Sequence, residues 1–81
     1  MFKHNIEKYT SSFVETFMVD EAKLHQLEYQ SIDEWDSVGH MTLIALLEEK
    51  FNIEMDIDDI IDFSSYKVGM KILEKYNITF K

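Results

Sequence analysis

Ser37 and His40 are the first residues whose types and spacing could perform a reaction. They stand three positions apart, which can place both side chains on one face of a helix, and a serine beside an imidazole is a common pairing of nucleophile and base. Hydrolysis also requires an oxyanion hole and a cleft that excludes water, for which a chain of 81 residues has little material. We therefore expect no enzymatic activity and interpret His40 as a partly exposed helix residue. The alternative is a small hydrolase, whose turnover would be lost in both Ser37→Ala and His40→Ala.

The other titratable side chains do not indicate a metal centre. The chain has no cysteine, and its three histidines are widely spaced, at His4, His25 and His40. An acidic run begins like a calcium-binding loop, at Asp56, Asp58 and Asp59. An EF-hand needs an oxygen ligand, a glycine and a glutamate at its fifth, sixth and twelfth positions, which here are Ile60, Ile61 and Lys67. We expect these carboxylates to form the solvated face of a short helix.

The position of Ser37 is a stronger signal than its pairing with His40. The tripeptide Asp36-Ser37-Val38 ends a long stretch without periodicity and opens an amphipathic segment. A serine at a helix N-terminus suits an anionic substituent, because free backbone N–H groups and the helix dipole stabilise a phosphate there. The alternative is that Asp36 or Ser37 only caps the helix.

The composition limits which elements can position that serine. The chain has no proline and only two glycines, so it lacks the turn residues that strands and hairpins require. Apolar residues make up 46% and aromatic residues 14% of the chain, which is too hydrophobic for a disordered tail. We therefore expect one folded, helical domain over residues 1–81.

The charge of the chain limits its partners. Sixteen acidic residues against eight lysines give a formal charge of −8, and seven of the sixteen lie between Glu48 and Asp62. Such a surface repels nucleic acid and anionic lipid and favours basic protein patches. No apolar stretch reaches the roughly 20 residues that span a bilayer, and residues 1–10 lack a secretory signal pattern. We expect no membrane insertion and a cytoplasmic location.

Apolar spacing predicts an all-α fold with four helices. The first covers residues 3–18, with a stripe at Phe2, Ile6, Tyr9, Phe13 and Phe17. Residues 20–36 form a long loop. The second helix covers residues 37–51, with a stripe at Val38, Met41, Ile44, Ala45, Leu47 and Phe51. A short third helix covers residues 56–62, and Ser64 or Ser65 caps a last helix with apolar positions at Tyr66, Met70, Leu73 and Tyr76 or Asn77. These elements predict a small four-helix bundle.

The order of these motifs resembles the acyl carrier protein family, whose members carry acyl and aminoacyl groups on phosphopantetheine. The family pattern is Asp-Ser-Leu opening the second helix, an apolar stripe, a Glu-Glu pair before an aromatic residue, and an acidic third segment. Here it reads Asp36-Ser37-Val38, then Met41, Ile44 and Leu47, then Glu48-Glu49-Lys50-Phe51. The acidic third segment is residues 53–61, which combine acidic and apolar side chains. The resemblance covers nearly the whole chain.

The resemblance implies that 4′-phosphopantetheine is attached to the Ser37 hydroxyl and brings the thiol that the chain lacks. It implies a monomer that is modified by a phosphopantetheinyl transferase and loaded by an acyl- or aminoacyl-activating ligase or an acyltransferase. A downstream synthase or transferase would take the cargo. The implied docking residues are Asp36, Val38, Met41, Glu48 and Glu49. The packing of Met41, Ile44, Ile61, Met70 and Leu73 would set the depth of the acyl site.

Several positions depart from the family pattern. Val38 replaces the commoner leucine, Glu34 replaces a common glycine, and Gly39 and Thr42 stand where fatty acid synthesis carriers usually have acidic residues. The run Trp35 to Met41 is more similar to free-standing carriers of specialised pathways. Gly39 is either a tolerated glycine or a point where the tether or a partner approaches the backbone.

The implied docking residues also have purely structural interpretations. Glu48 and Glu49 could form an ordinary solvated helix face, and Val38 and Met41 could belong to the core. For the whole chain, the alternative function is an acidic helical adaptor that binds a basic protein and carries no prosthetic group.

Overall fold

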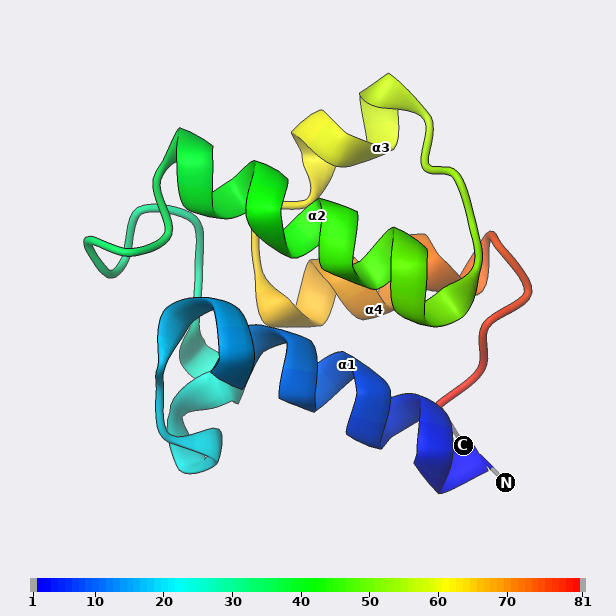
Figure 1. The fold of residues 1–81 in the computed structure, drawn as a ribbon, viewed down its shortest axis with the longest axis horizontal. Helices are drawn as coiled ribbons and strands as arrows, with labels where there is room; N and C mark the ends of the chain where they lie inside the picture. Colours follow the sequence, from blue (N-terminus) through cyan, green and yellow to red (C-terminus); the bar gives the residue numbers. More distant parts are fainter. Residues whose placement is uncertain (1, 81) are drawn as a thin grey trace.

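The structure is a computed structural model that describes the backbone of residues 2–80 and the side chains of residues 5–80. The side chains of Phe2 and His4 lie outside the described residues. The elements are α1 (Phe2–Phe17), the 3-10 helix η1 (Glu21–Gln26), α2 (Ser37–Phe51), α3 (Ile57–Asp62) and α4 (Tyr66–Glu74) (Figure 1). Within residues 2–80 there is no strand, and the only sheet-like pairing is an isolated antiparallel bridge between Glu28 and Ser65. The predicted all-α class is confirmed.

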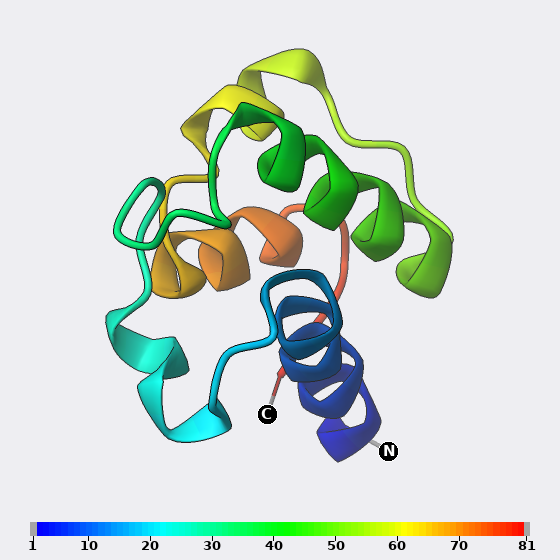
Figure 2. The same ribbon diagram turned by 60° about the vertical axis from the view of Figure 1, so that its left-hand side comes forward.

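The helices pack around a core that is rich in aromatic rings. α1 packs against α2, and η1 contacts both α1 and α4. Figure 2 shows α3 on the side of α2 and α4 that faces away from α1. The stripe on α1 is confirmed where it is described, because Tyr9, Phe13 and Phe17 are all buried. Phe13 lies against Trp35 at 5.5 Å between ring centroids, which joins α1 to the loop before α2.

The stripe predicted for α2 is confirmed at Ile44 and Leu47 and wrong at Val38, Met41 and Ala45. Its buried side chains are His40, Leu43, Ile44 and Leu47, whereas Val38, Met41 and Ala45 are exposed. The helix carries apolar side chains on most of its sides, so apolar spacing alone does not identify the inner face. The packing of α2 on α1 decides which side is buried.

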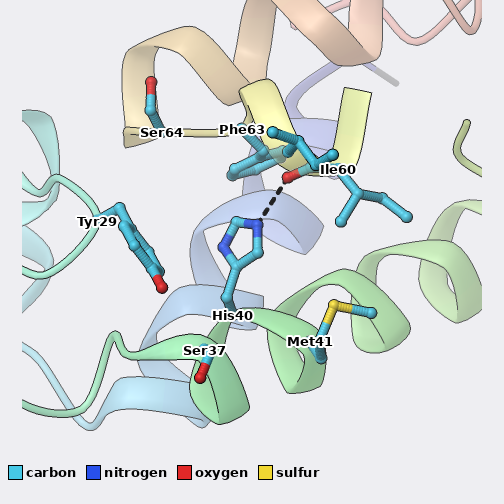
Figure 3. A pocket seen from close by; sticks show the side chains of 8 residues that line it. Tyr29, Ser37, His40, Met41, Ile60, Phe63 and Ser64 are labelled. Atoms are coloured by element: carbon cyan, nitrogen blue, oxygen red, sulfur yellow. Dashed lines mark hydrogen bonds between the residues drawn. The ribbon is translucent and has the colours of Figure 1, made fainter. Parts of the chain in front are cut away.

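The long connection between α1 and α2 is more regular than predicted. η1 begins after Asp20, whose carboxylate accepts a hydrogen bond from the N–H of Ala22 at 3.2 Å. The following residues are fastened to the link between α3 and α4, since the N–H of Tyr29 donates to the carbonyl of Ser64 at 2.8 Å. Tyr29 and Ser64 thereby come to line one pocket with Ser37, the first residue of α2 (Figure 3).

The predicted N-cap of the last helix is confirmed. The hydroxyl of Ser65 accepts a hydrogen bond from the N–H of Val68 at 3.0 Å, and the helix ends at Glu74, before the predicted Tyr76 or Asn77. Asn77 has a positive φ of 67°, a left-handed backbone conformation that does not continue a helix.

The prediction that Asp59 belongs to a solvated face is wrong. Asp59 is buried, and its carboxylate accepts hydrogen bonds from Nζ of Lys75 at 2.5 Å and from the hydroxyl of Tyr76 at 2.6 Å. These contacts fasten α3 to the end of α4. The hydrogen bonds from Lys75 and then Tyr76 lower the pKa of Asp59 from its ordinary value.

This lowered pKa predicts acid sensitivity. Above the unfolded-state pKa of about 3.9, the ionised Asp59 stabilises the fold, and this stabilisation is lost as the pH falls through the lower folded-state value. We expect the stability of the wild type to fall more steeply between about pH 5 and pH 2 than that of Asp59→Asn, measured by urea unfolding at each pH. Asp58→Asn, at an exposed neighbour, is the matched control and should follow the wild-type slope. Parallel curves for wild type and Asp59→Asn would contradict the prediction.

Candidate functional site

Ser37 is the first residue of α2, and its side chain is exposed. Asp36 is the N-cap, because its Oδ1 accepts a hydrogen bond from the N–H of Gly39 at 2.8 Å. The capping role therefore belongs to Asp36, and no hydrogen bond of the Ser37 hydroxyl is present among the described residues. The hydroxyl is free to accept a substituent.

Gly39 is necessary for the junction between the loop and α2. A Cβ at this position would lie 2.0 Å from the carbonyl oxygen of Glu34 and 3.1 Å from Cε1 of Phe17. The group that approaches this glycine is the loop's own backbone. The interpretation of Gly39 as a merely tolerated glycine is therefore wrong, and an approach by a tether or partner stays a prediction.

The prediction that His40 is partly exposed is also wrong. Its side chain is 9% exposed and bridges the loop and α3. Nδ1 accepts a hydrogen bond from Nε1 of Trp35 at 2.9 Å, and Nε2 lies 2.7 Å from the carbonyl oxygen of Ile60. Because the indole only donates and the carbonyl only accepts, the ring hydrogen is on Nε2. Both ring nitrogens are thus engaged away from Ser37, and this geometry gives the hydrolase interpretation no support.

A cleft of about 330 Å³ opens beside Ser37, between α2 and α3 (Figure 3). Its apolar lining comes from Met41, Ile60, Ile61 and Phe63, and its hydroxyl groups from Tyr29, Ser37 and Ser64. His40 completes the lining and points toward Ile60. The cleft can hold a small, mostly apolar group attached at or near the Ser37 hydroxyl.

The cleft differs from the acyl site expected from the resemblance. Met41 and Ile61 do line it, but Ile44, Met70 and Leu73 do not. Ile44 and Leu73 are fully buried core residues, and Met70 packs partly buried against the same core. The cleft therefore lies at the outer edge of the core, because side chains of α2 and α4 already fill the interior.

The predicted docking residues lie mostly on the outer side of α2. Val38 is 74% and Met41 is 53% exposed, so a core role for these two is wrong. Asp36 and Glu49 are also exposed. Glu48 is half-buried, and its Oε2 accepts a hydrogen bond from the N–H of Met55 at 2.9 Å, which fixes the link between α2 and α3. The docking role of these residues stays a prediction.

Sequence reasoning missed Tyr29, Ile60, Phe63 and Ser64 as residues that line the cleft. Tyr29 and Ser64 meet through the bridge between Glu28 and Ser65, and no local pattern marks such a pairing. The hydrogen bond from Trp35 to His40 had one weak indication in the sequence. The only tryptophan of the chain stands directly before Asp36-Ser37.

The described residues contain no group of three His, Asp or Glu side chains that could hold a metal ion. No helix among them combines the length and apolar character that crossing a membrane requires. A scan against known protein families finds no match to the chain, and a search of curated proteins finds none either.

Proposed function

We propose that this chain is an acyl carrier protein of the four-helix type. It would carry an acyl or aminoacyl group as a thioester on 4′-phosphopantetheine attached to Ser37, and deliver that group to partner enzymes of a biosynthetic pathway. The observation that supports this most is the exposed Ser37 hydroxyl at the first position of α2, on the rim of an apolar cleft.

The residues around Ser37 fit the prosthetic group. The Asp36 carboxylate accepts from the N–H of Gly39. Among the described residues, the N–H groups of Ser37 and Val38, at the first two positions of α2, make no hydrogen bond to another backbone group. Together with the helix dipole, these groups favour a phosphate on Ser37. When bound, phosphopantetheine supplies the thiol that carries the acyl group. The chain has no cysteine of its own.

The outer side of α2 would present the carrier to its partners. Exposed Val38 and Met41 lie close to Ser37 in the sequence of one helix, and Glu49 is exposed further along it. The expected counterparts are basic patches on a phosphopantetheinyl transferase, on an activating ligase or acyltransferase, and on a downstream synthase or transferase. Charge complementarity speeds association, while weak exposed ion pairs keep dissociation fast. We propose that the carrier acts as a cytoplasmic monomer.

The test is the intact mass of the protein after incubation with coenzyme A and a broad-specificity phosphopantetheinyl transferase. We expect one phosphopantetheine adduct on the wild type and complete loss of the adduct in Ser37→Ala. Ser64→Ala is the matched control, because Ser64 is exposed and lines the same cleft. It should be modified like the wild type. No adduct on the wild type, or an adduct that persists in Ser37→Ala, would refute the proposal.

One observation favours the second candidate, an acidic adaptor. Ile57 and Ile61 of α3 are 72% and 73% exposed, beside acidic residues, which suits binding to a partner protein. The adaptor would be unmodified when purified from its own source and would give no adduct in the test above.

A further inference from the structure

The imidazole of His40 lines the cleft beside Ser37 and reaches from α2 to the carbonyl oxygen of Ile60 in α3. The ring lies between Trp35, which donates to it, and the carbonyl of Ile60, which accepts from it. We propose that His40 is a specificity-determining residue that keeps the cleft shallow and so restricts the cargo on Ser37 to short acyl groups. This inference rests on the proposed carrier function.

The contacts of His40 resist any deepening of the cleft. Trp35 is fully buried, and its ring lies edge to edge with the imidazole, with 17° between the two planes and 6.2 Å between their centroids. Phe63 approaches the imidazole edge-on at 6.0 Å between centroids. If the imidazole moved aside, Nε1 of Trp35 would remain in the core without an acceptor, and a buried unpaired donor is strongly unfavourable. A long acyl chain would therefore contact the His40 imidazole, whose displacement is unfavourable.

The outer wall of the cleft is also held in place. Asp59 of α3 is fastened to Lys75 and Tyr76, and the hydroxyl of Tyr76 accepts from the N–H of Asp56 at 2.9 Å. α3 cannot move away from α2 without breaking these bonds as well as the bond from His40 to Ile60. The volume of about 330 Å³ lies near the lower end of the range of roughly 300 to 1,000 Å³ for small-molecule sites. The end of the phosphopantetheine arm would take part of that space.

The test uses coenzyme A thioesters of increasing length, namely acetyl, butyryl, hexanoyl, octanoyl and dodecanoyl, each attached to the wild type by the transferase. The melting temperature of each loaded protein is compared with that of the unacylated phosphopantetheine form. Burial of a methylene is worth at most roughly 3 to 6 °C in a domain of this size. We expect the melting temperature to rise over the short chains and to stop rising by octanoyl. A continued rise through dodecanoyl would overturn the inference, whereas failure of every attachment would refute the carrier function itself.

Variants separate this role from a purely structural one. In His40→Ala, the acyl-chain length at which the melting temperature stops rising should increase, because the imidazole is removed. In the matched control His25→Ala, at an exposed histidine, that length should stay as in the wild type. Trp35→Phe removes the donor to Nδ1 together with part of a buried ring, so it should lower every melting temperature and give a smaller shift of that length in the same direction. A structural role alone would lower all melting temperatures equally without changing that chain length, and this result would overturn the inference.

Discussion

Replacing Gly39 with alanine is expected to lower the free energy of unfolding by about 2 to 3 kcal/mol and to slow the modification of Ser37. The new Cβ would lie 2.0 Å from the carbonyl oxygen of Glu34, and this atom belongs to the backbone. A backbone atom cannot rotate away as a side chain can, so the loop or the first turn of α2 must move. That movement would strain the hydrogen bond from the Gly39 N–H to Asp36 that orients the start of the helix.

The direction of this effect is diagnostic. Gly39 lies in a helix and has no positive φ, so propensity alone would make alanine more stable by about 1 kcal/mol. Urea unfolding measures the stability, and the rate of adduct formation by mass spectrometry measures modification. Thr42→Ala, at an exposed position of the same helix, is the control and should stay close to the wild type in both. A Gly39→Ala protein that is as stable as the wild type would contradict the close approach of the loop.

Replacing Gly69 with alanine is expected to lower the free energy of unfolding by about 1 to 3 kcal/mol, because it overfills the core. A Cβ there would lie 2.3 Å from both Cζ of Phe63 and the hydroxyl oxygen of Tyr9. Tyr9 is fully buried, and its hydroxyl donates to the carbonyl of Tyr66 at 2.5 Å, so its ring has little freedom to yield. Thermal and urea unfolding would measure the loss.

A double-mutant cycle identifies the contact that causes the loss. Tyr9→Phe removes the hydroxyl that the new methyl group would meet, at the expense of a hydrogen bond worth about 1 kcal/mol. The double variant Tyr9→Phe/Gly69→Ala should therefore lose less stability than the sum of the two single variants. Strict additivity would show that crowding against the Tyr9 hydroxyl does not limit position 69.

The features that were predictable from the sequence are local ones. Each depends on residues a few positions apart: the apolar spacing of α1, the capping of α4 by Ser65, and the placement of Ser37 at the start of α2. Such signals act through one turn of helix, so they need no knowledge of the rest of the molecule.

The buried face of α2 was not predictable in the same way. Leu43 is fully buried although it lay outside the predicted stripe, and the exposed Val38 and Met41 lay within it. Asp59 was misread for a related reason, because its partners Lys75 and Tyr76 follow 16 and 17 residues later. Polar residues can be buried when a partner satisfies them, and the sequence does not show which partner is near.

By itself, then, the sequence determined that the chain is helical, where its main helices begin, and that a serine opens α2. Only the tertiary structure decided that His40 lines a cleft at that serine and is hydrogen-bonded to Trp35 and Ile60. The physical reason is the range of the interactions. Helix periodicity and capping act between near neighbours, whereas the cleft is made by residues from Tyr29 to Ser64 that meet only when α2, α3 and the loop pack together.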